Sequence, residues 1–141
     1  MARIVRKRKS TPPPSTPLAA LLDAYLEDRR VKNYSEYTLR VQRIHLQFFI
    51  YWAVERGIAE PVEVTRSVLE QYQRHAFYYL KKNGEPLSFT SQKNRVAPLR
   101  TWFRWMARHY HILHNPASEL EIPRIGFRLP RAVLTAEESE Q

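Results

Sequence analysis

The chain has 141 residues, 43% of them hydrophobic, a formal net charge of +9 at pH 7 and 0 cysteines. This length and composition predict one globular domain with a real core and exclude a disordered chain. The lack of cysteine excludes a disulfide framework and a cysteine nucleophile, and the basic balance favours a polyanionic partner, most often nucleic acid.

Residues 1–16 are predicted to be a flexible basic arm. Five of the first nine residues are Lys or Arg and none is acidic. The TPPPSTP run that follows resists regular structure, because proline lacks an amide donor and has a fixed φ. The arm is expected either to add non-specific attraction to phosphate or to act only as a solubilising tail.

The first helix is predicted over Pro17–Val31, since proline suits a first-turn position. Its apolar stripe would face the core, and its acidic residues would face away from it. We therefore expect this helix to be a poor candidate for contact with DNA. The stripe comprises Leu18, Leu21, Leu22, Tyr25 and Leu26, and the acidic residues are Asp23, Glu27 and Asp28.

The second helix is predicted over Glu36–Glu55, with Ser35 as its cap and Gly57 as its stop. At the helical angle, one apolar arc contains Val41, His45, Phe48, Phe49 and Trp52, widened by Leu39, Leu46, Ile50 and Ala53. The opposite sector, about 60° wide, contains Arg40, Arg43 and Gln47. His45 is interpreted as a core histidine, because no second metal ligand is suitably spaced.

The third helix is predicted to be capped by Thr65 and to run to about Lys82. Asn83-Gly84 would end it, and Pro86 would prevent its continuation. Its buried side is expected to comprise Val68, Leu69, Tyr72, Ala76, Tyr79 and Leu80.

The fourth helix, within residues 87–110, separates apolar from basic side chains more cleanly than any other segment. One arc of about 120° contains Val96, Leu99, Trp102, Phe103, Met106 and Tyr110, and another of about 80° contains Lys93, Arg100, Arg104 and Arg108. Thr90 or Ser91 is the expected cap. Pro98 predicts a bend near Asn94 and Arg95, a shortened first turn, or a helix that begins only near Pro98. The basic face either meets a polyanion or is merely solvated.

The remaining sequence reads as a connection. Asn115-Pro116 marks a stop, residues 117–120 fit a single turn, and Pro123 and Pro130 favour extended chain. Thr135 and the acidic residues after it resemble the cap and first turn of another helix, whose body would follow Gln141. The sequence therefore suggests the front part of a longer protein. No period-two strand pattern is visible.

No constellation of catalytic groups is found. The sequence has no Gly-rich phosphate loop, no HExxH and no GxSxG. His111 and His114 lack a third ligand, so neither a metal nor another cofactor is expected. The tyrosines lie mostly on apolar faces and are assigned to packing. No run of about 18 apolar residues exists, so no membrane span is predicted.

Three stretches in order resemble one family. The first is NYSEYTLRVQRIHLQFFIYWAVERG, with a serine cap, an aromatic pair and a small loop. The second is LSFTSQKNRVAPLRTWFRWMARHYHILHNPASEL, with an Asn-Pro-Ala stop, and the third is RLPRAVLTAEESEQ. Together they resemble the core-binding domain of tyrosine recombinases, the phage-integrase and Xer-like group.

The resemblance implies an all-α fold, a four-helix SAM-like orthogonal bundle over residues 17–120. Residues 121–141 would then be a linker and the first turn of a catalytic domain. It also implies that the second and fourth helices face the major groove of double-stranded DNA. By position, the candidate DNA contacts are Arg40, Arg43, Gln47, Lys93, Arg100 and Arg104. Gln92 and Asn94 are candidates to read base edges, since amides pair well with adenine.

In the family, the catalytic arginines, lysine, histidines and tyrosine belong to the domain after Gln141. The resemblance therefore implies a DNA-binding fragment that is not itself an enzyme. It also implies a cytoplasmic, nucleoid-associated parent that assembles as a tetramer on DNA, while the fragment is monomeric. Two alternatives remain open: an independent helical DNA-binding regulator, and a protein-interaction bundle whose basic faces are solvated.

Overall fold

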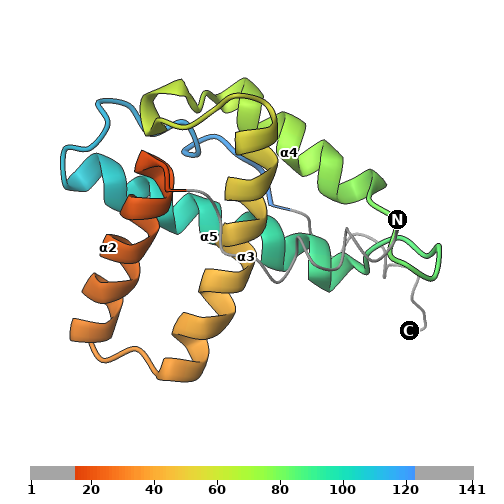
Figure 1. Cartoon of the computed structure of the whole chain (residues 1–141), viewed down its shortest axis with the longest axis horizontal. Coiled ribbons are helices and arrows are strands. Elements are labelled where there is room, and N and C mark those ends of the chain that lie inside the picture. Colours follow the sequence, from red (N-terminus) through yellow and green to blue (C-terminus); the bar gives the residue numbers. More distant parts are fainter. Residues whose placement is uncertain (1–14, 123–141) are drawn as a thin grey trace, which may run out of the picture.

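A computed structural model describes residues 15–122. This part of the chain is all-α, with helices α2 (Pro17–Val31), α3 (Glu36–Glu55), α4 (Arg66–Tyr78) and α5 (Phe89–Arg108), and a 3₁₀ turn, η1 (Pro61–Glu63). Helices α2 and α3 form an antiparallel pair, and α5 crosses behind α3 (Figure 1). Helix α3 thus packs against both α2 and α5, while α4 packs against α5.

A hydroxyl caps the start of every long helix in the described region. The side chains of Thr16, Ser35, Thr65 and Ser88 each accept a hydrogen bond from a first-turn amide, at 3.1–3.2 Å. These bonds satisfy donors that have no partner inside the helix. The predicted bounds of α2 and α3 and the caps Ser35 and Thr65 are confirmed. The predicted cap of the fourth helix was wrong: Ser88, rather than Thr90 or Ser91, begins α5.

Helix α4 is shorter than predicted and ends at Tyr78 rather than near Lys82. Beyond it the chain folds back on itself, and the Lys81 amide donates to the Glu85 carbonyl at 2.8 Å. This tight turn engages backbone groups that a longer helix would have used. It also leaves Leu80 60% exposed, although the sequence predicted its burial.

Helix α5 continues through Pro98, so the alternative in which the helix begins only near this proline was wrong. The bend expected near Asn94 remains a prediction. Tyr110 lies beyond the helix in a left-handed conformation, with φ 65°, and is 92% exposed rather than buried. Trp105 is buried instead, because its ring meets the edge of Tyr25 from α2, with the centroids 5.5 Å apart.

The buried face of α3 is also rotated from the predicted one. Leu39, Leu46, Phe49, Ile50 and Ala53 lie in the core, where α2 and α5 cover them from two sides. Of the five side chains expected at the centre of that face, Phe49 and Trp52 are buried as predicted. The other three are only half-buried and lie along its margin: Val41, His45 and Phe48.

The described region closes with a turn at residues 117–120, as predicted. The Leu120 amide donates to the Ala117 carbonyl at 3.1 Å, and both side chains are buried. Gln73 of α4 then donates to the Glu121 carbonyl at 2.7 Å. Most of the predicted arm, residues 1–14, and most of the predicted linker and helix turn, residues 123–141, lie outside the described residues.

Candidate nucleic-acid interface

A groove of about 380 Å³ lies between α3 and α5. The two helices pack through Phe49 and Phe103, whose rings meet edge to face with centroids 6.2 Å apart. The α5 wall is built of small side chains, which leave room between the helices. The lining residues are Tyr37, Thr38, Val41, Gln42 and His45 of α3, and Asn94, Ala97, Pro98 and Thr101 of α5.

A row of cations follows this groove along α5. Lys93, Arg100 and Arg104 are exposed, and none of them has an ion-pair partner within residues 15–122. Ala97 in the groove wall is four residues after Lys93 and three before Arg100, so these side chains are neighbours on the helix surface. At 1.5 Å per residue, the row from Lys93 to Arg104 is about 16 Å long. The rim of the groove on the α5 side therefore carries concentrated positive charge, with no ion-paired acid among residues 15–122.

On the α3 side, Arg40 is exposed and extends this charge. Its guanidinium carbon lies 5.9 Å from the ring centroid of Tyr37, which itself lines the groove. Gln47, two turns further along the helix, is half-buried. Arg40 thus lies between this groove and a second pocket toward α2, which it lines with Arg30, Glu36 and Arg43.

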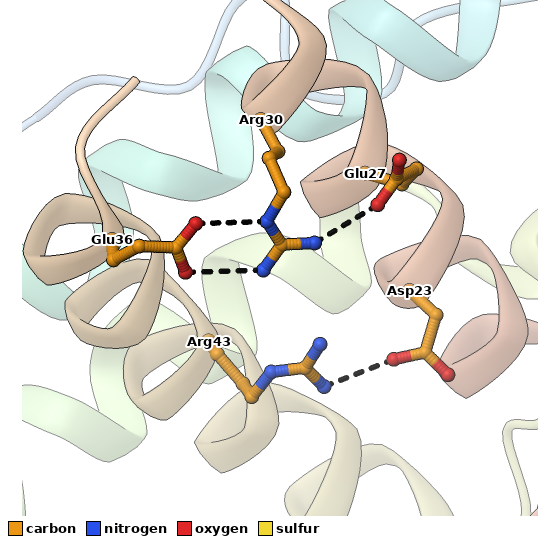
Figure 2. Close-up of polar contacts among 5 residues, drawn as sticks. All are labelled: Asp23, Glu27, Arg30, Glu36 and Arg43. Carbon is orange, nitrogen blue, oxygen red and sulfur yellow. Dashed lines mark hydrogen bonds and ion pairs between the residues drawn. The ribbon is translucent and has the colours of Figure 1, made fainter. Parts of the chain in front are cut away.

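Arg43 is turned the other way, toward α2. Its Nη1 lies 2.9 Å from Oδ1 of Asp23, and the same surface holds Arg30 between Glu27 and Glu36 (Figure 2). Arg30 contacts Glu36 through Nε at 2.9 Å and Nη2 at 3.3 Å. This pairing lowers the pKa of the Glu36 carboxyl below its usual value. The basic candidate Arg43 is therefore compensated by an acid, unlike the α5 cations.

The two amide candidates, Asn94 and Gln92, differ in their surroundings. Asn94 is exposed and lines the groove. Gln92 is half-buried and donates to the Leu87 carbonyl at 3.2 Å, so its amide helps to fix the start of α5. A second amide in the groove, that of Gln42, was not among the predicted site residues. Little in the sequence indicated that Gln42 belongs to a site, because it lies beside Val41 at the edge of an apolar arc.

His45 was predicted to be in the core but lines the groove, half-buried. Burial and the nearby Arg95 charge lower the pKa of its imidazole below the usual value of about 6.5, so the ring is neutral at pH 7. Its Nδ1 is buried and has no hydrogen-bond partner within the described chain. The groove floor is thus uncharged at pH 7, although its rim is strongly positive.

Comparison with known proteins places this geometry in a family. The chain is 51% identical over 135 residues, 96% of its length, to tyrosine recombinase XerC 2 of Ralstonia nicotianae. The chain belongs to the tyrosine recombinase family. It is also 28% identical over 108 residues to tyrosine recombinase XerC of Xylella fastidiosa. It spans 39% and 34% of the lengths of these two tyrosine recombinases. No protein-family model matches the sequence.

The fold agrees with that membership. The crystal structure of the N-terminal domain of a phage integrase/site-specific recombinase from Haloarcula marismortui superposes with a TM-score of 0.65 at 23% identity. The match covers 78% of this chain and 99% of that domain. The chain therefore has the all-α fold of a tyrosine-recombinase core-binding domain, as the sequence predicted.

The most buried tyrosines of this recombinase domain have packing roles. Tyr25 and Tyr72 lie in the core, and burial raises the pKa of both phenols above their usual value. Tyr72 meets Phe49 and Trp52 at centroid distances of 5.0 and 5.2 Å. Within residues 15–122, no three His, Asp or Glu side chains gather as metal ligands. None of the helices in that region is both long and apolar enough to cross a membrane.

Proposed function

We propose that this chain is the DNA-binding, core-binding domain of a site-specific tyrosine recombinase, and that it grips the recombination site through α3 and α5. The observation that carries the proposal is the row of Lys93, Arg100 and Arg104 beside the groove. Exposed cations without carboxylate partners are available to phosphate, and their contact with DNA releases condensed counterions.

The contrast between α2 and α5 supports the proposal that α5, and not α2, faces the DNA. The outer side of α2 presents Asp23 and Glu27. Of its two arginines, Arg30 is paired with acids, and the guanidinium of Arg29 lies over the rings of Tyr25 and Tyr34. Helix α5 instead has an exposed basic side and a buried aromatic side with Trp102 and Phe103, which holds it in place. The major groove, about 12 Å wide, admits a helix whose long side chains project from one side. Helix α5 meets that requirement, and α3 supports it through Arg40.

The roles of the candidate residues follow from their positions. Arg40, Lys93, Arg100 and Arg104 contact phosphates or guanine edges, and Asn94 reads base edges from within the groove. Gln47 is an accessory contact on the outer side of α3. Arg43 and Gln92 contribute only after they leave their present partners, the Asp23 carboxylate and the Leu87 carbonyl.

In this proposal the catalytic groups belong to another part of the parent recombinase. The chain itself binds DNA without cutting it. The parent protein assembles as a tetramer on its DNA in the cytoplasm, whereas this domain alone is a monomer. Membership of the family and the partial coverage of its relatives support these statements.

The test is titration of the chain with a mixed-sequence DNA duplex at several salt concentrations. The affinity of the unmodified chain for DNA should fall by orders of magnitude between about 50 and 200 mM salt. Arg100→Ala/Arg104→Ala should bind more weakly and lower the salt slope by about one for each phosphate that an arginine no longer reaches. An affinity indifferent to salt would contradict DNA binding and favour a protein-interaction bundle.

The matched control is Arg66→Ala/Arg74→Ala, which removes the same charge from exposed positions on α4. This control should retain most of the affinity of the unmodified chain, since both residues belong to α4 and not to the proposed DNA-binding helices α3 and α5. Equal losses in the two double variants would show that net charge, and not the α5 row, determines binding. Circular dichroism should show that both variants remain folded.

A further inference from the structure

The α3–α5 groove has a floor whose chemistry differs from that of its rim. None of the nine lining residues is Lys, Arg, Asp or Glu. The apolar part comprises Val41, Ala97 and Pro98, and Thr38 and Thr101 belong to the same lining. The charges lie outside it, on Arg40, Lys93, Arg100 and Arg104.

The polar residues of the lining are two with amides, a histidine with a neutral ring, and three with hydroxyls: Tyr37, Thr38 and Thr101. Asn94 offers a donor and an acceptor. Gln42 lies on the opposite wall of the groove, and its Oε1 is buried. His45 adds a ring that is neutral at pH 7, because burial and Arg95 lower its pKa. The floor is therefore suited to uncharged hydrogen-bonding edges and to small apolar groups.

The base pairs of DNA differ in which of these groups they match. In the major groove, thymine presents its C5-methyl group to apolar contacts, and adenine pairs its N6 and N7 with an amide side chain. Guanine is read mainly by Arg or Lys, and cytosine by Asp or Glu, and the floor holds none of these. Its composition thus matches A·T pairs and lacks the charged groups that most often read G·C pairs, while the threonine hydroxyls favour neither.

We propose that this groove reads thymine through its C5-methyl group, with Val41 and Ala97 as the apolar contacts. Asn94 would hydrogen-bond to an adenine next to that thymine. The inference rests on the proposed DNA-binding function and assigns the base that the groove lining prefers. The positive rim would hold the phosphates on either side while the methyl group enters the uncharged floor.

The charge on the rim favours DNA over the other occupants of an apolar groove. A second copy of the chain would bring its own Lys93, Arg100 and Arg104 toward a surface of the same sign if it used this face. A polyanion is attracted by that rim, and duplex DNA supplies both the charge and the methyl groups.

The experiment compares two duplexes that differ only in the methyl group: alternating dA·dT and alternating dA·dU. Base pairing and phosphate charge are the same in both. The parent chain should bind the thymine duplex more tightly, by about fourfold for each methyl group buried. Equal affinity for the two would overturn the thymine proposal and leave the proposed DNA binding intact. Failure to bind either duplex at low salt would instead contradict the proposed function.

Two variants locate the effect. Val41→Ala should lower the ratio of thymine to uracil affinity toward one, with little change in binding to the uracil duplex. Val62→Ala, at a 70% exposed position in η1 outside the groove, should keep the parent ratio. If Val41→Ala is folded by circular dichroism and keeps the same ratio of thymine to uracil affinity as the unmodified chain, the assignment of this groove is overturned.

Discussion

The guanidinium carbon of Arg95 lies 4.1 Å from the centroid of the Phe48 ring and 4.9 Å from that of Tyr79. A cation of α5 thus bridges an aromatic ring of α3 and the ring that follows α4. Positive charge over an aromatic face is attracted by the ring quadrupole, and more strongly where water is partly excluded. Arg95 is half-buried, so we assign it to the packing of three helices rather than to DNA.

Replacing Arg95 with alanine should therefore lower the free energy of unfolding by about 1–2 kcal/mol. Urea denaturation followed by tryptophan fluorescence would measure the loss. Arg100→Ala is the control. Arg100 is exposed and has no ion-pair partner within residues 15–122, so its loss should change stability by no more than about 0.5 kcal/mol. Equal stability of the two variants would contradict the role assigned to Arg95.

Local signals were sufficient to predict much of the fold. The bounds of α2 and α3 followed from Pro17, Ser35 and Gly57, which act within one helical turn. The end of α4 could not be predicted in this way. The turn between Leu80 and Pro86 competes with helix formation through backbone contacts that the hydrophobic periodicity of the sequence does not indicate. The burial of Trp105 likewise depends on Tyr25, which is distant in sequence.

The candidate site was predictable only in part, for the same reason. The exposed α5 cations were visible from periodicity, because a helix places residues seven and four apart on one side. The partner of Arg43 was not, since Asp23 lies 20 residues earlier in another helix. The groove was missed because it lies at the margin of the buried face, where Gln42 and His45 resemble core positions.

Asp23→Asn should strengthen DNA binding by freeing Arg43. The change removes an acid, and the salt slope should rise by about one if Arg43 then reaches a phosphate. Because Asp23 is 69% and Arg43 41% exposed, loss of their ion pair should cost no more than about 1 kcal/mol of stability. Titration with a DNA duplex at several salt concentrations measures the slope.

Glu27→Gln is the matched control for that variant. Glu27 is also an α2 acid, but it pairs with Arg30, which is not proposed to contact DNA. Adding Arg43→Ala to Asp23→Asn should abolish the gain in affinity. The same gain in Glu27→Gln would show that only the net charge matters.

Trp102→Ala should destabilise the domain by about 3–5 kcal/mol, the usual cost of replacing a buried aromatic residue with alanine. Trp102 is 0% exposed and packs against Phe103, with the centroids 5.3 Å apart. Thermal unfolding followed by circular dichroism would measure the loss, and Trp102→Phe should lose less because it keeps a ring. Parent-like stability of Trp102→Ala would contradict the assigned inner side of α5.

Acid should destabilise the domain first through two half-buried histidines. Burial lowers the pKa of His45, and Arg95 lowers it further. Burial also lowers the pKa of His75, with help from Arg56 and Arg95 and against the opposing charge of Glu55. Below the unfolded pKa of about 6.5, the unfolded chain therefore binds more protons than the folded one.

The sign of the effect follows from that difference. Stability rises with pH wherever the unfolded state binds more protons, so it should be full above about pH 6.5 and decline as the pH falls through the lowered pKa values. Carboxylates with lowered pKa, such as Glu36, contribute at more acidic pH.

Urea denaturation between about pH 7 and pH 5 isolates the histidine contribution. His45→Gln/His75→Phe should flatten the decline, since neither new side chain titrates. A decline of parental slope in the double variant would show that other groups cause it.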